Sequence, residues 1–136
     1  MKPEEMDRQI DEHFRFEATD DIEGVLSTLT DDVDHDIVGL PGGAVHRRED
    51  ARRFYEDLFK DLSESRVQKI RRYYGDHFMV DESLWSGRAP GRPFGFEGRN
   101  RPLKFRLLHV LEFAGDGRIK RENVWLDFAA IVQQLS

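Results

Sequence analysis

The feature that most constrains the fold is a change in the spacing of apolar residues near residue 62. Before this point, apolar side chains recur every three or four residues, the period of an amphipathic helix. The helical stripes consist of Met6, Ile10 and Phe14, then Ile22, Val25, Leu26 and Leu29, then Ala51, Phe54, Tyr55, Leu58, Phe59 and Leu62. After it, residues 67–74, 77–88, 103–113 and 119–126 alternate in the manner of strands. The sequence therefore predicts helices followed by a sheet.

Shorter signals complete this prediction. Residues 33–38 are typical of a strand, and 128–135 of a short closing helix. Ala114-Gly115-Asp116-Gly117 indicates a tight hairpin, and residues 90–102 a loop rich in proline and glycine. Helices before an antiparallel sheet indicate an α+β fold in which the helices cover one sheet face. The sequence contains no repeat and no linker, so residues 1–136 are expected to form one domain. Because a curved sheet that is wrapped on a layer of helices tends to enclose a pocket, we also expect a pocket between them.

Composition excludes several classes of protein. The 136 residues contain no cysteine, so disulfides, a thiol nucleophile and cysteine-bound zinc are absent. No apolar run approaches the roughly 18 residues of a membrane span, and the first residues are not typical of a signal peptide. The net charge of −6 disfavours nucleic-acid binding. No nucleotide-binding motif is present, so we expect a cytoplasmic protein without a cofactor.

One strand carries a polar residue on its apolar face. In residues 103–113, one face contains His109 among apolar side chains, which are Leu103, Phe105, Leu107, Leu111 and Phe113. A buried histidine of this kind either satisfies a structural hydrogen bond or carries out chemistry. His109 is therefore the first candidate for a catalytic residue.

The hairpin register decides which residue lies beside His109. A four-residue loop places His109 opposite Glu122, and a two-residue loop places it opposite Val124 with Glu122 one pair away. A three-residue loop reverses the face and brings in Asn123. Two of the three registers therefore predict a His109–Glu122 pair, which would serve either as a structural ion pair or as a proton-transfer pair.

A second polar cluster is Asp34-His35-Asp36. Strand alternation separates His35 from the two aspartates, so a three-ligand metal site is not expected. A lone inward carboxylate, Asp36 or Asp34, has a raised pKa in apolar surroundings and can act as a general base. The alternative is a solvated aspartate at a strand end.

Several further residues are candidates for the pocket wall. Tyr55 lies on the apolar stripe of the third helix, where its hydroxyl needs a partner. Glu82 and Trp85 lie on opposite faces of one strand, so either can line the pocket. Phe94 and Phe96 are apolar residues within the 90–102 loop and are expected at the mouth of the pocket.

The order of several segments resembles the nuclear transport factor two-like superfamily, especially its SnoaL-like branch. The segments are Leu29-Thr30-Asp31-Asp32-Val33, Asp36-Ile37-Val38-Gly39, Phe54-Tyr55, Gly117-Arg118-Ile119 and Trp125-Leu126-Asp127. The resemblance implies a cone-shaped α+β barrel, in which a curved, mixed, mostly antiparallel sheet wraps around the N-terminal helices. It also implies an enclosed apolar cavity and, in many members, a homodimer formed through the outer sheet face.

Within this superfamily, the spacing is similar to that of ketosteroid isomerase. The resemblance implies that Asp36 matches the general base and Tyr55 a supporting tyrosine. His109 and His13 fall where that enzyme has its two oxyanion-hole donors, and Glu122 falls on an inward position that is apolar there. Because both donors are changed to histidine, steroid isomerisation is not expected. A cavity histidine beside a carboxylate is more similar to the SnoaL-like cyclases.

The resulting hypothesis is a cofactor-independent enzyme that transfers a proton on a small apolar carbonyl or polycyclic substrate. Asp36 or Glu122 would remove the proton, and His109 with His13 would stabilise the enolate oxygen or return the proton. The alternatives are a non-catalytic module that binds a small ligand or a partner, and an epoxide hydrolase or dehydratase. The expected partners are a small apolar ligand and a second copy of the chain, with no nucleic acid, membrane or metal.

Overall fold

The computed structural model describes residues 1–136 and has four α-helices, one 3-10 turn and five strands. In chain order they are α1 (Pro3–Ala18), α2 (Ile22–Ser27), β1 (Leu29–Val38), α3 (Arg48–Asp61), β2 (Ser63–Tyr74), β3 (Phe78–Ala89), η1 (Pro93–Gly95), β4 (Arg101–Phe113), β5 (Ile119–Leu126) and α4 (Phe128–Leu135). The prediction of helices before a sheet is confirmed, and β1 is the early strand that the sequence indicated.

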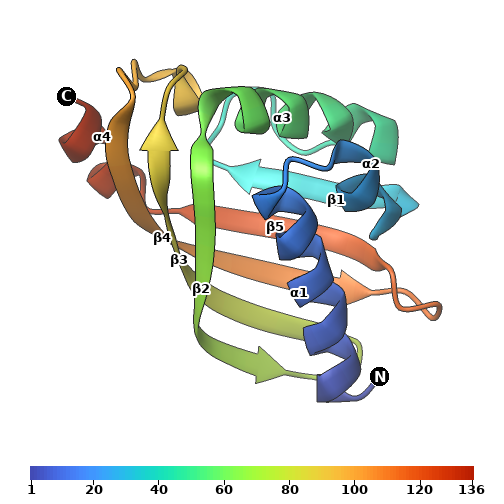
Figure 1. Ribbon diagram of the computed structural model, residues 1–136. Helices are drawn as coiled ribbons and strands as arrows, with labels where there is room; N and C mark the ends of the chain where they lie inside the picture. The colour runs from blue at the N-terminus through green and yellow to red at the C-terminus, as the bar shows by residue number, and fades with distance from the viewer.

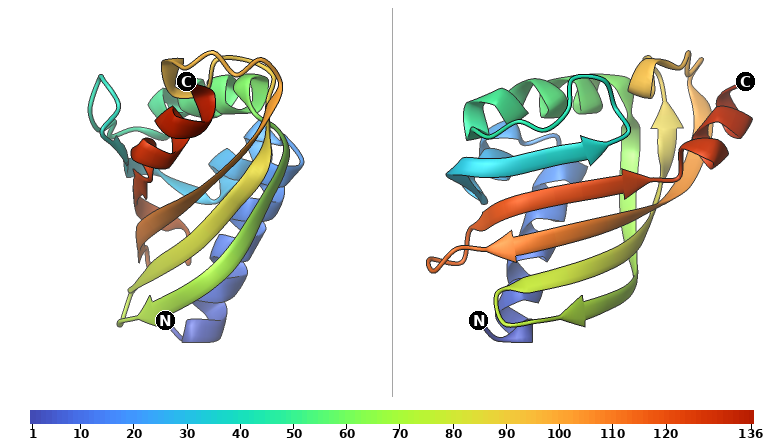
Figure 2. Two further views of the ribbon diagram at one scale, coloured as in Figure 1. Left: turned by 90° about the vertical axis from the view of Figure 1, so that its left-hand side faces the viewer. Right: turned by 180° about the vertical axis from the view of Figure 1, so that it is seen from behind.

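The strands form one curved sheet in the order β1-β5-β4-β3-β2. β1 pairs with β5 in parallel, and all other neighbours are antiparallel. Helix α1 crosses the concave side of this sheet and α3 covers its upper end (Figures 1 and 2). The predicted α+β cone with a mixed, mostly antiparallel sheet is confirmed, although the sheet stays open and does not close into a barrel.

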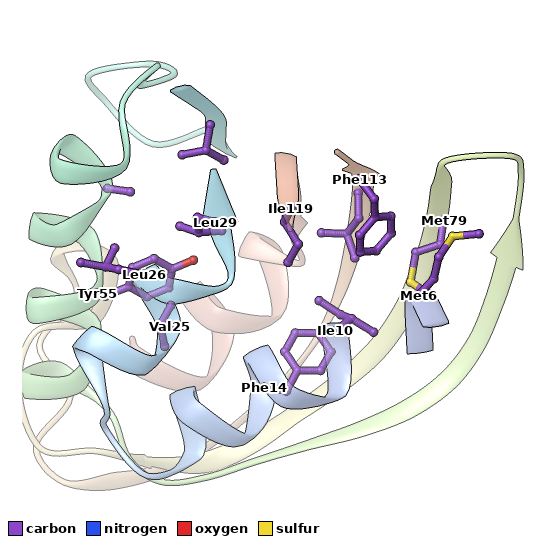
Figure 3. Close-up of a cluster of buried hydrophobic side chains, with 13 residues drawn as sticks. Met6, Ile10, Phe14, Val25, Leu26, Leu29, Tyr55, Met79, Phe113 and Ile119 are labelled. Atoms are coloured by element: carbon purple, nitrogen blue, oxygen red, sulfur yellow. The ribbon is translucent and has the colours of Figure 1, made fainter. Parts of the chain in front are cut away.

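Apolar residues of α1 attach this helix to the sheet. Met6, Ile10 and Phe14 are buried in a cluster that also contains Met79 and Phe113 from the strands (Figure 3). Full burial of one such side chain contributes about 1.5–3 kcal/mol relative to exposure. A second, smaller cluster forms around the upper ends of β3 and β4, and its members are Leu62, Trp85, Ala89, Leu103, Phe105, Ile131 and Leu135.

The hairpin between β4 and β5 combines two of the expected registers. Close to the turn, the amide of Ala114 bonds to the carbonyl of Arg118, as in a three-residue loop. The register then shifts by one residue, because Phe113 pairs with Ile119 whereas Glu112 pairs with Arg121. The unpaired residue, Lys120, is a β-bulge. Because the bulge restores the original face, His109 lies opposite Val124 and Glu122 faces inward rather than Asn123.

Candidate active site

An apolar cavity lies between the concave face of the sheet and helices α1 and α3. Together with its open mouth it has an empty volume of about 680 Å³, and 14 of its 18 lining residues are hydrophobic. A largely apolar wall with a few polar groups is typical of a site for a small organic ligand. The polar lining residues are Glu17, Ser65, His109 and Glu122.

The predicted wall residues divide into two groups. Trp85 and Phe94 line the cavity as predicted. Phe96 does not line the cavity, although it packs against the second apolar cluster as Phe94 does. Tyr55 is fully buried behind the cavity wall, where its hydroxyl bonds to Glu122. The prediction for Glu82 is wrong: its side chain lies on the outer sheet face and accepts a hydrogen bond of 2.9 Å from Arg106.

His109 is held by an aspartate on the neighbouring strand. Asp81 of β3 lies directly opposite His109 in the β3–β4 pairing, and its Oδ1 is 3.0 Å from His109 Nδ1. Asp81 is fully buried and also accepts bonds from Ser83 Oγ at 2.5 Å and from Arg72 Nε at 2.8 Å. Burial alone would raise the pKa of Asp81, but the hydrogen bond from His109 and those from Ser83 and Arg72 hold it below its usual value.

The partner predicted for His109 was therefore wrong. His109 and Glu122 share the inner face and both line the cavity, but Glu122 makes its close contacts with other residues. Asp81 was missed, although strand alternation could have found it. If Trp85 faces inward, residues two and four positions earlier on the same strand, Ser83 and Asp81, face inward as well.

Glu122 belongs to a second buried polar cluster. Its Oε2 lies 3.1 Å from His13 Nε2, and its Oε1 accepts a bond of 3.2 Å from the hydroxyl of Tyr55. Tyr55 oxygen in turn lies 3.1 Å from His35 Nε2. Because Tyr55 donates to Glu122, the Nε2–H of His35 donates to Tyr55. The result is a series of hydrogen-bonded side chains that runs from β1 through α3 to β5. His13 of α1 joins this series at Glu122.

The hydrogen bonds fix the charge state of His13. Thr28 Oγ1 donates to the carbonyl of Val25 at 2.6 Å, so it can only accept at its 2.7 Å contact with His13 Nδ1. His13 Nε2 faces the Glu122 carboxylate, and both ring nitrogens therefore carry protons. Burial lowers the pKa of His13, but the Glu122 and Glu17 carboxylates outweigh this effect and raise it to about 9.

The same pairing controls Glu122 and its other neighbours. Burial raises the pKa of Glu122, but the charge and hydrogen bond of His13 hold it well below its usual range. Burial lowers the pKa of His35 and raises that of Tyr55 well above 10. Glu122 is thus an ionised carboxylate paired with His13, and its low pKa makes it a weak base.

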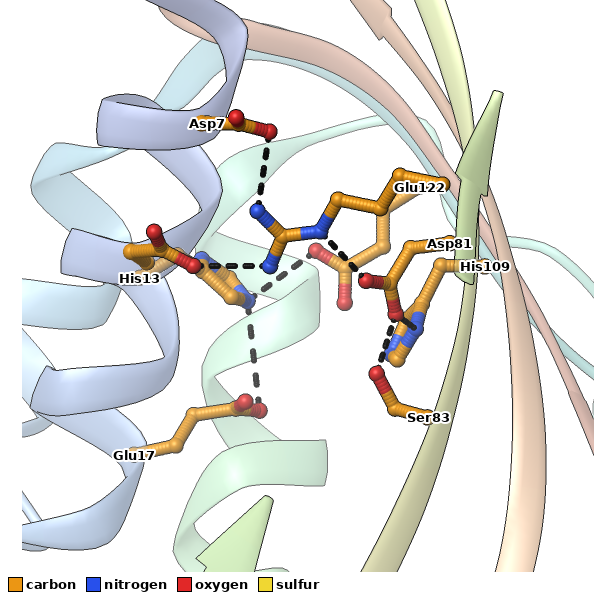
Figure 4. A network of polar contacts seen from close by, with 9 residues as sticks. Asp7, His13, Glu17, Asp81, Ser83, His109 and Glu122 are labelled. Atoms are coloured by element: carbon orange, nitrogen blue, oxygen red, sulfur yellow. Dashed lines mark hydrogen bonds and ion pairs between the residues drawn. The ribbon is translucent and has the colours of Figure 1, made fainter. Parts of the chain in front are cut away.

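Glu17 is a cavity residue that the sequence analysis did not select. It lies one turn after His13 on α1, 3.9 Å from His13 Nε2, with 18% of its side chain exposed. Burial raises the pKa of Glu17 to about 7, and the attraction of His13 only partly offsets this. Figure 4 shows Glu17 on the helix and His109 with Asp81 on the facing strands, on opposite sides of the open space. The helical i, i+4 spacing from His13 was the available signal.

Asp36 is not part of the site. Within residues 33–38 of β1 the buried residues are Val33, His35 and Ile37, whereas Asp34 and Asp36 lie on the other face and are partly exposed. The prediction of an inward Asp36 is therefore wrong, and His35 takes the inward position. The apolar neighbours at positions 33 and 37 carried this information, because they mark the face that the core requires.

The raised pKa of Glu17 predicts a cost in stability. The folded chain binds this proton more tightly than the unfolded chain, so the free energy of unfolding falls as the pH rises from 4.5 to about 7. Glu17→Gln removes the titration, and we expect the variant to be more stable than wild type by up to about 3 kcal/mol at pH 8. Urea titration measures this difference.

Glu12→Gln is the matched control, because Glu12 lies on the same helix in an exposed pair with Arg15. The stability of Glu12→Gln should stay close to that of wild type at pH 8, because an exposed ion pair contributes little. Equal stability of Glu17→Gln and wild type at pH 8 would show that the Glu17 carboxylate is not strained by burial.

No group of three or more histidine, aspartate or glutamate side chains is arranged to hold a metal ion. None of the helices is long and apolar enough to cross a membrane.

The curved, mixed sheet wrapped around a helix defines a class of cone-shaped α+β domains (Figure 1). The chain belongs to the SnoaL-like domain family, whose model matches residues 10–122. No functionally curated protein matches the sequence significantly.

Solved structures show the same fold at low sequence identity. TsrD from Streptomyces laurentii is similar over 100% of this chain and 98% of its own, with 13% identity and a TM-score of 0.85. A protein assigned as a SnoaL-like polyketide cyclase from Jannaschia sp. CCS1 covers 100% and 96%, with 16% identity and a TM-score of 0.85. An LEH-like epoxide hydrolase from M. tuberculosis covers 96% and 89%, with 16% identity and a TM-score of 0.74. At these identities the likeness shows the fold alone.

Proposed function

We propose that the chain is a cofactor-independent enzyme that moves a proton on a small, apolar carbonyl or polycyclic substrate. The observation that supports this is the placement of His109. One ring nitrogen is held by the buried Asp81, and the ring lines a cavity that is otherwise largely apolar. A histidine that is oriented by a buried carboxylate and faces an apolar pocket is typical of an acid–base site.

The Asp81 contact assigns His109 a role as base. Ionised Asp81 accepts the proton of Nδ1, which leaves the Nε2 lone pair as the acceptor. Nε2 makes no hydrogen bond within the chain. It would take a proton from the carbon next to the substrate carbonyl, and the electrons of the broken C–H bond would form the enolate. The imidazolium that results would be stabilised by Asp81.

Glu17 is suited to act at the substrate oxygen. With a pKa of about 7 it is substantially protonated near neutral pH, so it can donate a hydrogen bond or a proton to the developing oxyanion. Return of the proton from His109 to a different carbon of a conjugated enolate would complete an isomerisation. Attack of the enolate carbon on a second carbonyl, whose oxygen then takes the proton from the His109 imidazolium, would instead complete a cyclisation. Glu122 and His13 would not transfer protons. Their opposite charges would instead set the electrostatic surroundings of Glu17.

Exchange of the α-protons of 2-tetralone in D2O, followed by proton NMR, tests the proposal. This bicyclic ketone is small and neutral, and exchange requires only removal and return of the proton. We expect catalytic amounts of the chain to accelerate exchange above the buffer rate. Binding of 2-tetralone without any acceleration would contradict the proposal and support the non-catalytic module instead.

The alternative of a non-catalytic binding module has one observation in its favour. The buried charges compensate each other, His13 with Glu122 and Asp81 with Arg72, so a purely structural role would satisfy them. The epoxide hydrolase and dehydratase alternatives rest on the fold alone.

The pKa of Glu17 predicts the pH dependence of this activity. A group that must be protonated loses its function as the pH rises through its pKa, so kcat should fall above about pH 7. In Glu17→Gln the amide still donates a hydrogen bond but does not titrate. In this variant we expect a lower kcat that does not decline near pH 7. If kcat of the variant declined near pH 7 as in wild type, a group other than Glu17 would be responsible.

A homodimer through the outer sheet face also remains a prediction, as does the cytoplasmic location. Tyr73, Leu108 and Trp125 are 57%, 37% and 40% exposed on this face. Leu108→Arg should convert a dimer to a monomer in size-exclusion chromatography with light scattering. Val132→Arg is the control, because Val132 is 40% exposed on α4, away from this face. A wild-type monomer would contradict the prediction.

A further inference from the structure

Arg72 joins the sheet to helix α1, and it bonds to Asp81, the residue that also holds His109. It lies on β2, and its side chain is only 3% exposed. Its Nε donates to Asp81 at 2.8 Å, its Nη1 to Asp7 at 2.9 Å and its Nη2 to Asp11 at 2.7 Å. One guanidinium therefore serves a carboxylate of the sheet and two carboxylates of the helix (Figure 4).

The geometry suits an arginine in particular. A planar guanidinium presents its N–H groups in a fixed fork, so bonds in three directions hold it in one orientation. Tyr74 also donates to Asp7 at 2.7 Å, which adds a second link from β2 to the same helix. Asp81 then receives bonds from Arg72, Ser83 and His109, and its carboxylate is fixed from three sides.

The two ends of this network carry the two cavity residues that act in the proposed function. Asp81 orients His109 on the sheet, and Asp7 and Asp11 belong to the helix that carries Glu17. We propose that Arg72 is a positioning residue that fixes the ring of His109 through Asp81 and docks α1 against the sheet through Asp7 and Asp11. The expected effect of Arg72 on the reaction rate rests on the proposed function. Its expected effects on the His109 ring and on the attachment of α1 do not.

Two variants separate the two halves of the network. Arg72→Lys keeps the positive charge but replaces the fork by a single ammonium nitrogen, which does not reproduce the three fixed directions of the guanidinium. Asp7→Asn/Asp11→Asn weakens the helix side and leaves the Arg72–Asp81 pair. Arg106→Lys is the matched control, because Arg106 is paired with Glu82 on the outer face of the strand that carries His109.

The first readout is the ¹⁵N NMR spectrum of the His109 ring, assigned by its loss in His109→Gln. In wild type and Arg106→Lys we expect neutral His109 to carry its proton on Nδ1. In Arg72→Lys we expect a mixture of the two tautomers, because Asp81 is no longer fixed. The second readout is backbone amide exchange in α1, which should become faster in the double aspartate variant and in Arg72→Lys only.

The effect on 2-tetralone exchange should appear in kcat. Misplacement of reacting groups by about 1 Å can cost about 100-fold, so we expect kcat to fall about 10- to 100-fold in Arg72→Lys. KM should stay within about threefold, because the apolar walls are unchanged.

A wild-type tautomer of His109 together with wild-type α1 exchange in the two test variants would overturn the inference, whatever the activity. Should Arg72→Lys fail to fold, α1 exchange in the double aspartate variant decides it alone. If wild type does not exchange 2-tetralone, the proposed function fails while the ring and helix readouts still decide the role of Arg72.

Discussion

His109→Gln should lower the rate of 2-tetralone α-proton exchange by about 10²- to 10⁴-fold, the usual contribution of a positioned acid or base. Glutamine occupies a similar volume but has no basic nitrogen, so proton removal at Nε2 is lost. The apolar walls of the cavity are unaffected, and KM should change much less than kcat.

Asp36→Asn is the matched control for this result. Asp36 lies on the sequence segment that resembles the general base of ketosteroid isomerase, but the structure places it on the outer face of β1. We expect its exchange rate to remain within about threefold of wild type, because surface substitutions away from a site have small effects. A large loss in Asp36→Asn, with little loss in His109→Gln, would reverse the assignment of the base.

The second large effect concerns stability. Glu122→Gln should lower the free energy of unfolding at pH 6 by about 3–5 kcal/mol, the usual cost of removing one partner from a buried ion pair. His13 then retains its two protons with only the more distant Glu17 carboxylate, 3.9 Å away, as a counter-charge, or it loses one and leaves a buried nitrogen poorly paired. Guanidinium titration with circular dichroism measures the loss.

Glu112→Gln controls for the loss of a carboxylate on a sheet strand. Glu112 pairs with Arg121 on the partly exposed outer face, so we expect a change below about 1 kcal/mol. The double variant His13→Leu/Glu122→Leu removes both charges and should recover much of the lost stability. A small cost in Glu122→Gln would show that the pair is not held as an ion pair in solution.

The same pair gives the wild-type stability a defined pH dependence. His13 has a pKa of about 9 in the fold and an ordinary value of 6.5 when unfolded. Its contribution is fully present below pH 6.5 and is lost as the pH rises through 9. The low pKa of Glu122 adds stability above its ordinary value of 4.5, which is lost as the pH falls below it. We therefore expect the free energy of unfolding to decline between pH 6.5 and 9 in wild type, and this decline to disappear in His13→Gln.

The sequence was sufficient to predict the architecture because apolar periodicity determines which faces are buried. The stripe of Met6, Ile10 and Phe14 and the alternation of residues 103–113 both describe faces that the structure buries. The same alternation brought His109 and Glu122 inward. His35 and Asp81 could have been found in the same way, since Ile37 and Trp85 mark their faces.

The contacts between inward residues could not be predicted, because they depend on distances across the sheet. Alternation places a side chain on a face but does not choose its partner there. The bulge at Lys120 fixed the face of Glu122, and nothing in the local sequence specified it. The ion pair of His13 with Glu122 depends on how α1 crosses the sheet, and the contacts that join α1 to the sheet are long-range, namely the apolar cluster and the ion pairs of Arg72.

Central to the proposed function is that the Asp81-oriented ring of His109 meets the substrate inside the cavity. The ¹⁵N NMR spectrum of the His109 ring, recorded with and without saturating 2-tetralone, tests it directly. We predict that Nε2 shifts on binding while the proton stays on Nδ1. Binding of 2-tetralone that leaves the Nε2 resonance unchanged would contradict the claim, because the ligand would then lie away from the base.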